Sequence, residues 1–381
     1  MFRQKQTSPD ANTAEKLDWL RLSRTENVGP ITFYRLVERF GSASEALAAL
    51  PELSKRGGRK KQLTAPSIAE VEKEYAGLRK LGGDIVTATD DTYPLALSAC
   101  DDAPPVLSYF GDIRLANQNC IALVGARNAS LNGRKMAEKL AADLGARKQV
   151  VVSGLARGID TAAHKGALAA GTIAVVAGGI DVVYPEENQG LYEEIKERGL
   201  ILAESPFGQK PFAQSFPRRN RIVSGLSKAV IVVEATMRSG SLITARLAGE
   251  QGRDVMAVPG HPLDPRAAGP NHLIRDGANL VRSAEDVLEI IMNFSGNAMR
   301  EPFAQRPLFE QPAPANEDNA DAPSEDDRTR LLSQLSFTPA SIDEVLRAGD
   351  MSIPALQTLL LELELAGRVK RLPGNRVALI A

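Results

Sequence analysis

The chain has 381 residues, of which 43% are hydrophobic and 24% are charged, and its formal net charge is −1 at pH 7. This length predicts two or three domains, and the balanced charge excludes a globally basic nucleic-acid binder. Two cysteines exclude a disulfide framework and a cysteine-based zinc site. The polar start and the absence of an apolar run of about 18 residues predict no signal peptide and no membrane span, so we expect a cytoplasmic protein.

Short helices are predicted over residues 13–80, the first domain. Apolar side chains recur at helical spacing from Ile31 to Phe40, and Val28-Gly29-Pro30 interrupts the helical pattern before them. The broken pair resembles a SAM-like or helix-hairpin-helix module, although a Gly-Pro turn between helices can also be only a turn. The segment Lys55–Lys61 then carries five positive charges in seven residues. It is either a solvated loop or an additional phosphate contact.

Residues 82–295 alternate between apolar strands and helices, and they form the second predicted domain. Asp84–Ala88 begins a pair of short strands at one edge. Ile121–Val124 opens a strand–helix series that continues to Val255–Val258. This alternation predicts an α/β domain with a Rossmann-like, doubly wound and mainly parallel sheet, whose ligands bind at the carboxyl ends of the strands.

Glycine-containing turns follow three of these strands, and each leads into a helix. The first N–H groups of a helix lack internal partners and attract anions, and glycine permits a ligand to approach the backbone closely. Gly125, Gly154 and Gly158 lie in the first two turns. The polar residues that we assign to a phosphate site in or beside the three turns are Arg127, Arg157, Lys165, Ser239, Ser241 and Thr244, with Gly240 between the two serines.

The segment Ser215–Arg221 carries the strongest local signal for nucleic acid, because it concentrates guanidinium groups at the start of a helix. Its candidate contacts are Arg218, Arg219, Asn220 and Arg221. Since Glu204 and Glu234 end neighbouring strands, we expect at least one of these arginines to form a structural salt bridge instead. Nearby aromatic side chains are candidate stacking platforms or core residues; they are Phe207, Phe212 and Phe216.

Two common nucleotide sites are absent from the pattern. Gly125-Ala126-Arg127 does not match GxGxxG, and no acidic residue ends the second strand to hold a ribose, which argues against NAD. The chain also lacks the GxxxxGK[ST] motif of an ATP-binding P-loop. We expect no cofactor, and His261 and His272 are poor support for a metal. Several phosphate-type turns on one sheet edge fit a polymer backbone better than a mononucleotide.

Residues 296–327 are rich in proline, alanine and acidic side chains and are predicted to be a flexible linker. Residues 328–381 follow as a third domain, in which three helices and a hairpin resemble a winged helix. The third helix carries Glu362 and Glu364 but no lysine or arginine, which favours a structural or protein-contact module. Basic residues on the wing favour DNA contact instead; they are Lys370, Arg371 and Arg376.

Taken together, the motifs resemble those of the DNA-processing protein A family, DprA or Smf, in matching order over about residues 82 to 290. They are Ser153–Asp160 with Ala163–Leu168, Pro217–Ile222, Ser239–Ala245, Val258–Gly260 and Gly269–Ile274. The resemblance implies a homodimer without catalytic turnover that binds and shields single-stranded DNA and helps load the RecA recombinase during natural transformation. It also places Arg127 in the DNA pocket, surrounded by Ser130, Lys165, Arg218, Asn220, Arg221, Ser239 and Ser241.

Two other functions stay open. The glycine-rich turns are also similar to those of nucleotide phosphoribohydrolases of the lysine-decarboxylase-like group, whose PGGxGTxxE motif ends in a catalytic glutamate. Aligning Gly240-Ser241 with its Gly-Thr pair puts Thr244 at the glutamate position, and a hydroxyl cannot replace that carboxylate. Asp160 and His164 could form another acid/base pair, but helix capping and packing explain them better. The third possibility is an adaptor whose terminal domains hold partners.

Overall fold

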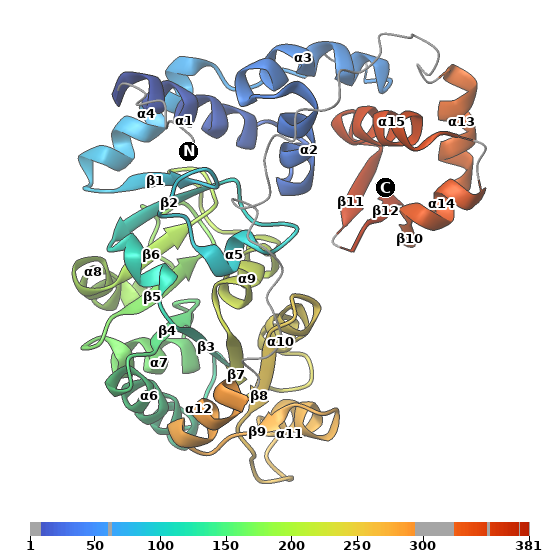
Figure 1. Ribbon diagram of the computed structural model, residues 1–381. Helices are drawn as coiled ribbons and strands as arrows, with labels where there is room; N and C mark the ends of the chain where they lie inside the picture. The colour runs from blue at the N-terminus through green and yellow to red at the C-terminus, as the bar shows by residue number, and fades with distance from the viewer. Residues whose placement is uncertain (1–8, 60–62, 294–323, 349–350, 373, 381) are drawn as a thin grey trace. The chain divides into compact units, whose positions relative to one another are not determined.

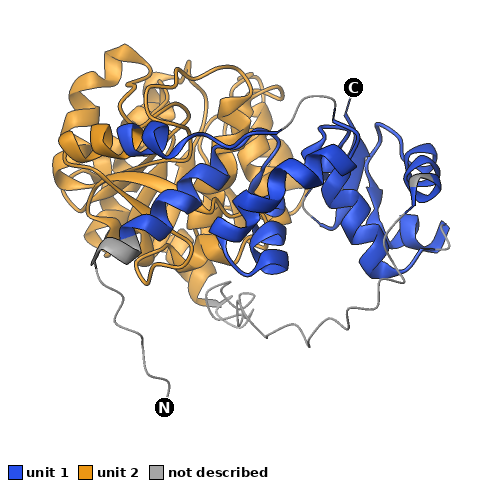
Figure 2. Ribbon diagram, turned by 90° about the horizontal axis from the view of Figure 1, so that it is seen from above, with its two compact units in different colours: residues 1–73, 307–381 blue, residues 74–306 orange. Residues whose placement is uncertain are grey.

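The structure is a computed structural model that describes residues 9–59, 63–293, 324–348, 351–372 and 374–380. The chain divides into two compact units (Figure 2): unit 1 comprises residues 1–73 and 307–381, and unit 2 comprises residues 74–306. The predicted linker, residues 296–327, lies outside the described residues up to residue 323. Lys60 and Lys61 of the basic segment also lie outside them.

Unit 2 contains a nine-stranded sheet with the strand order β1-β2-β6-β5-β4-β3-β7-β8-β9 (Figure 1). Its strands are β1 (Asp84–Thr87), β2 (Val106–Gly111), β3 (Cys120–Val124), β4 (Val150–Ser153), β5 (Thr172–Val176), β6 (Leu200–Ala203), β7 (Ala229–Val232), β8 (Asp254–Ala257) and β9 (Asn279–Leu280). The pairs β1–β2 and β2–β6 are antiparallel and the others are parallel. The predicted mainly parallel sheet is confirmed.

The order of the strands reverses at β3. Strands β4, β5 and β6 extend the sheet on one side of β3, whereas β7 pairs with its other side. In open α/β sheets ligands bind outside the carboxyl ends of the strands at such a reversal, because the following loops leave toward opposite faces. The topology therefore predicts a crevice between the loops that follow β3 and β7.

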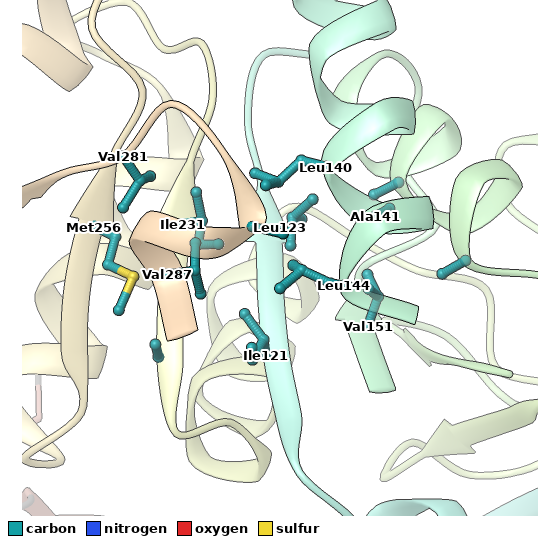
Figure 3. Close-up of a cluster of buried hydrophobic side chains, with 14 residues drawn as sticks. Ile121, Leu123, Leu140, Ala141, Leu144, Val151, Ile231, Met256, Val281 and Val287 are labelled. Carbon is teal, nitrogen blue, oxygen red and sulfur yellow. The ribbon is translucent and has the colours of Figure 1, made fainter. Parts of the chain in front are cut away.

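Helices precede, connect and follow these strands. They are α4 (Ile68–Lys80), α5 (Leu95–Ser98), α6 (Leu131–Ala146), α7 (Ile159–Ala167), α8 (Gln189–Arg198), α9 (Ser215–Leu226), α10 (Gly240–Glu250), α11 (Ala268–Arg275) and α12 (Ala284–Asn293), with 3-10 turns η1 (Ile113–Asn117) and η2 (Glu186–Asn188). Leu140 and Leu144 of α6 and Val287 of α12 pack on Ile121 and Ile231 of the sheet (Figure 3). Each such buried aliphatic side chain stabilises the fold by about 1.5–3 kcal/mol. This packing holds β3 and β7 in place, and the loops after these two strands border the expected crevice.

Unit 1 joins the N-terminal helices to the C-terminal module. The elements are α1 (Pro9–Ser23), α2 (Pro30–Phe40), α3 (Ala43–Arg56), α13 (Glu325–Gln334), β10 (Ala340–Ser341), α14 (Ile342–Ala348), α15 (Ile353–Leu365), β11 (Val369–Leu372) and β12 (Arg376–Leu379). The three strands form an antiparallel sheet in the order β10-β12-β11. Three helices followed by a hairpin confirm the predicted winged helix. Helix α13 begins at Glu325 with Ser324 as its cap, slightly before the predicted start at residue 328.

Helix α15 is covered inside unit 1. Asn27 Nδ2 donates to the Leu365 backbone oxygen at 3.3 Å, and a Cβ on Gly57 would collide with the backbone oxygen of Glu362. The N-terminal helices and the winged helix therefore pack on each other through α15.

None of the helices in the described ranges combines the length and apolarity needed to cross a bilayer. Within the same ranges, no three His, Cys, Asp or Glu side chains group into a metal site.

Candidate nucleic-acid interface

A cavity of about 960 Å³ opens at the carboxyl ends of β3 and β7, where the strand order reverses. We call it the trough. Its walls come from the β3–α6, β4–α7 and β7–α10 turns, from the loop between β8 and α11, and from α9. Lining residues from these elements include Arg127, Asn128, Gly154, Asn220, Ser239 and Ser241. Residues from turns far apart in the sequence thus line a single cavity, as the pattern of glycine turns predicts.

A smaller cavity of about 330 Å³ shares Arg127 and Phe216 with the trough, and we call it the side pocket. The exposed Arg127 places its guanidinium carbon 4.8 Å from the centre of the Phe216 ring. The Tyr184 ring lies 5.7 Å from the same ring. Arg127 therefore stands where the two cavities meet, with an aromatic ring holding it in place by cation–π attraction.

Glycine allows the first two turns to approach each other. Gly158 has φ +79°, and a Cβ there would collide with the backbone oxygens of Ala126 and Arg127. A side chain at this position would therefore separate the β4–α7 turn from the Arg127 loop. Only glycine fits both the backbone angle and the close approach.

The N-terminus of α10 is open to the trough. The Ser239 hydroxyl accepts a hydrogen bond from the Ser241 backbone N–H at 3.4 Å, and the two serine hydroxyls lie 2.7 Å apart. A Cβ on Gly240 would meet no atom within 4 Å. Backbone N–H groups, two hydroxyls and open space at a helix N-terminus favour a phosphate there.

The N-terminus of α6, by contrast, already holds an anion of the chain itself. Glu234 accepts a hydrogen bond from the Ser130 backbone N–H at 2.8 Å and another from the Ser130 hydroxyl at 2.5 Å. The same hydroxyl accepts from Gly133 N–H at 2.9 Å and caps the helix. The structure therefore places Ser130 against a carboxylate and not among the residues that line the trough.

Two of the predicted arginines are buried in the interior of unit 2. Arg219 is 7% exposed and donates to the backbone oxygens of Gly154 and Val175, while Arg221 is 8% exposed and forms an ion pair with Glu204 at 2.5 Å. Burial lowers the pKa of Arg219 to about 10, so its side chain stays charged at neutral pH. The expectation of a structural salt bridge in this segment is confirmed by Arg221. Arg219 also lines both the trough and the side pocket, whereas Arg221 lines neither cavity and supports the trough from within.

The other predicted cations differ in their surroundings. Arg157 borders the side pocket and pairs with Glu187 at 2.7 Å, with both side chains more than half exposed. Arg218 and Lys165 are exposed but belong to the lining of neither cavity. Asn220 lines the trough and donates to the Gly240 backbone oxygen at 3.4 Å. The structure thus brings together Arg127, Arg219, Asn220 and the α10 turn, with Arg157 at the neighbouring side pocket.

Asp160 and His164 are not arranged as an acid/base pair. Asp160 accepts from the backbone N–H groups of Gly154 and Ala156 at 3.1 and 3.3 Å. His164 is completely buried with its Nδ1 2.9 Å from the Thr172 hydroxyl, and burial lowers its pKa to about 3. A neutral, enclosed imidazole packs beneath the β4–α7 turn, as expected for a structural residue.

Sequence reasoning missed four polar residues of the trough, which are Asn128, Thr236, Asp264 and Arg266. Asn128 directly follows Arg127 in the first turn, so its position in the motif could have indicated it. Arg266 pairs with Asp264 at 3.0 Å in the loop after β8, where no strand–turn–helix pattern points to a site. Of the three candidate aromatic platforms, Phe216 alone lines these two cavities.

Comparison with known proteins is consistent with this architecture. Three family models match the chain: "DNA recombination-mediator protein A" over residues 84–292, "DprA-like N-terminal HHH domain" over 13–77 and "DprA winged helix domain" over 312–375. DNA processing protein DprA of Streptococcus pneumoniae is 50% identical over 201 residues, which are 52% of this chain and 71% of that protein. Protein Smf of Escherichia coli is 36% identical over 312 residues, 81% of each chain.

Two solved structures are also similar. The X-ray structure of DprA from S. pneumoniae has a TM-score of 0.62 and 38% identity, and covers 72% of this chain and 96% of its own. The structure of Helicobacter pylori DprA, described for its single-stranded DNA binding mode, has a TM-score of 0.51 and 29% identity, and covers 55% of this chain and 96% of its own. With three family models in chain order and a relative matched over four-fifths of the length, the chain belongs to the DprA/Smf family of DNA-processing proteins.

Proposed function

We propose that the chain binds single-stranded DNA in the trough, without strong sequence preference. The observation that supports this most directly is Arg127, an exposed guanidinium at the junction of both cavities that pairs with no carboxylate of the described residues. Beside it the N-terminus of α10 offers backbone N–H groups and the hydroxyls of Ser239 and Ser241. Charge and N–H donors at one edge suit phosphates, which carry most of the affinity for nucleic acid.

A single strand fits better than a duplex because its bases are free to stack on protein rings. Tyr184 and Phe216 line the side pocket and supply such rings next to Arg127. The H. pylori relative is described as binding single-stranded DNA, which supports the same ligand here. We assign the DNA contacts to Arg127, Asn128, Arg157, Asn220, Ser239, Gly240 and Ser241, with Arg218 and Lys165 as outer contacts of a longer strand.

We infer further that the protein acts as a non-enzymatic mediator. Thr244, at the position of the phosphoribohydrolase glutamate, is 2% exposed, and Glu234 is held by hydrogen bonds to Ser130. Family membership supports the remaining steps, in which a homodimer shields incoming DNA and transfers it to RecA during natural transformation. The exposed Leu263 and Leu280 are candidates for the dimer surface, since Leu280 lies on the edge strand β9. Release of free base from nucleoside monophosphates would contradict the non-enzymatic function.

The terminal domains are proposed as protein-contact modules. We divide the chain into a helical domain (13–80), a Rossmann-like domain (82–295) and a winged-helix domain (328–381). The third helix of the winged helix, α15, carries buried Glu362 and Glu364 instead of basic side chains. These carboxylates are matched inside unit 1 by Arg328 and Arg371, so α15 offers no cationic surface to DNA phosphates.

Binding of fluorescent oligothymidine to the full chain at several salt concentrations tests the proposed site. If about four to six phosphates are contacted, the log–log slope of affinity against salt is expected to be roughly −3 to −4, at about 0.7 per contact. Arg127→Ala should weaken binding about tenfold and reduce the slope by about 0.7, with an unchanged melting temperature.

Arg114→Ala is the matched control, because Arg114 has an 81% exposed side chain in η1, outside the lining of both cavities, and pairs with Asp112. It should leave the affinity unchanged. A flat salt response, or equal effects of the two variants, would overturn the assignment of the trough.

A further inference from the structure

Glu234, two residues after the end of β7, holds both ends of the loop that carries Arg127. Its backbone oxygen accepts from the Ala126 N–H at 2.6 Å, and its carboxylate accepts from the N–H and the hydroxyl of Ser130. Ala126 and Ser130 are the residues on either side of Arg127–Ala129. In the described part of the chain, one residue thus fixes the two points between which the Arg127 loop is suspended.

The same residue leads into the other wall of the trough. The chain continues from Glu234 through Thr236 to Ser239, the cap of α10. Ala235 is held in turn, because its N–H donates to the Arg266 backbone oxygen at 2.7 Å. Glu234 therefore connects the loop after β3 to the segment after β7, and these supply the guanidinium and the helix N-terminus of the trough.

The Glu234 carboxylate also occupies the N-terminus of α6, which leaves the N-terminus of α10 available to DNA. A Cβ on Gly133 would collide with the Glu234 carboxyl group, so glycine in the first turn of α6 makes the room that this group occupies. A carboxylate there takes the place that an external anion would otherwise take. The α10 N-terminus is capped by the neutral Ser239 hydroxyl and is open at Gly240.

We propose that Glu234 is a positioning residue for single-stranded DNA. Its carboxylate serves as the built-in anion of α6, fixes the Arg127 loop relative to the Ser239 turn and leaves the α10 N-terminus as the place for a phosphate. The inference depends on the proposed binding of DNA in the trough. It assigns Glu234 an effect on affinity that is opposite to the effect of its charge.

This opposite sign provides the test. If Glu234 acted only as a negative charge near the site, Glu234→Ala would strengthen the binding of an anionic polymer. As a positioning residue, its loss frees the Arg127 loop and should weaken binding about tenfold, which corresponds to about 1.4 kcal/mol. Glu289→Ala, which removes an exposed carboxylate from α12, controls for the change in net charge and should not weaken binding.

Chemical rescue supplies a readout that general destabilisation would not produce. Added acetate can occupy the emptied site at the N-terminus of α6, so it should restore the oligothymidine affinity of Glu234→Ala, compared with chloride at the same ionic strength. Wild type and Glu289→Ala should not respond to acetate. Tighter binding by Glu234→Ala, or weaker binding that acetate does not restore in a protein with the wild-type melting temperature, would overturn the proposal.

The double variant Arg127→Ala/Glu234→Ala separates this inference from the function on which it rests. If Glu234 acts through Arg127, the double variant should bind no more weakly than Arg127→Ala alone. Additive losses overturn the positioning role while leaving the trough as the DNA site. Unchanged affinity of Arg127→Ala would instead contradict the proposal that DNA binds in the trough. If Glu234→Ala lowers the melting temperature, Glu234→Gln is measured instead, because glutamine keeps the size of the side chain. Glu234→Gln should also weaken DNA binding, and its effect should also be non-additive with the effect of Arg127→Ala.

Discussion

Arg127 of the trough is exposed and has no carboxylate partner among the described residues. In unit 1, two arginines instead lie against acidic side chains of α15: Arg328 contacts Glu362 at 3.2 Å, and Arg371 contacts Glu364 at 3.6 Å. All four of these unit 1 side chains are at most 12% exposed. The same cationic group is thus matched by an acidic side chain in one region and left exposed in the other.

This difference helps to interpret the winged helix. The third helix of a DNA-reading module of this kind inserts into the major groove and requires an exposed surface. Here α15 is acidic and covered, with Leu365 accepting from Asn27 and Thr358 accepting from Arg39 at 3.2 Å. We therefore expect changes in this region to alter stability and changes in the trough to alter DNA binding.

The largest effect is expected from Arg371→Ala, which leaves Glu364 buried without its cation. Burial raises the pKa of Glu364 and the Arg371 guanidinium opposes that rise, so removing the guanidinium makes the charged carboxylate costly. Breaking a buried pair from one side destabilises strongly, and we expect a loss of about 3 kcal/mol by denaturant unfolding of the full chain. The affinity for oligothymidine should stay within about twofold of wild type.

Lys370→Ala is the matched control for this variant, because Lys370 is an exposed cation on the same strand, β11. It should change stability by less than about 0.5 kcal/mol. A loss of DNA affinity in Arg371→Ala that exceeds the loss in Arg127→Ala would reverse the comparison between the two regions.

A second, smaller effect should appear beneath the trough, where His164 is buried. Burial and the nearby Arg219 charge lower its pKa to about 3, whereas an unfolded histidine titrates near about 6.5. The unfolded state therefore binds the extra proton first, and stability is lost as the pH falls from about 6.5 toward about 3. At pH 5 the loss from this group is about 2 kcal/mol relative to pH 7.

His164→Asn checks this pH dependence, because asparagine can still donate to the Thr172 hydroxyl but cannot titrate. Between pH 7 and pH 5, the unfolding free energy of wild type should fall by about 2 kcal/mol more than that of His164→Asn. Parallel slopes in wild type and His164→Asn would show that His164 is not responsible for the acid sensitivity.

The next effect compares two helix caps, one in each region. Ser239 caps α10 at the trough, and Ser324 caps α13 in unit 1 through a capping box with Asp327. Either serine→alanine change should cost about 1 kcal/mol of stability, because one N–H group at the start of the helix loses its partner. Only Ser239→Ala should also weaken DNA binding. Equal DNA affinities in the two variants would separate the α10 N-terminus from the site.

The sheet and the cavity at its carboxyl edge could be predicted from the sequence. Continuous apolar runs followed by glycine turns indicate buried parallel strands, and the carboxyl ends of such strands share one edge of a sheet. Arg127 and the Ser239–Ser241 turn could therefore be assigned to one cavity from their places in the pattern. The winged helix followed in the same way from three helices and a hairpin in the C-terminal segment.

The roles of neighbouring arginines could not be predicted, because they depend on partners that are distant in the sequence. Arg218 and Arg219 are adjacent, yet the first is exposed and the second is buried among backbone oxygens of Gly154 and Val175. Ser130 likewise meets Glu234, 104 residues further along the chain. Local pattern shows that a side chain can bind an anion, but only the packed structure shows whether the chain already supplies one.

The smallest effect is expected at Arg157, a cation of unit 2 that is exposed like Arg127 but paired with a carboxylate like the arginines of unit 1. It borders the side pocket, as a DNA contact should, but pairs with Glu187 at 2.7 Å. Because the two side chains are 60% and 52% exposed, the pair should contribute less than about 1 kcal/mol of stability. Glu187→Gln should therefore barely change the melting temperature, while freeing Arg157 and strengthening oligothymidine binding about twofold.

Glu186→Gln is the control for this last variant, since it removes the same charge from the adjacent exposed position without breaking the ion pair. If the ion pair with Glu187 keeps Arg157 from binding DNA, Glu187→Gln should bind oligothymidine more tightly than Glu186→Gln. This difference in affinity should disappear when Arg157 is also changed to alanine. Equal gains in DNA affinity from both variants would mean that the loss of one negative surface charge strengthens binding, and not the release of Arg157. In that case Arg157 would belong with the self-matched arginines of unit 1, and Arg127 would remain as the cation that the trough presents to DNA.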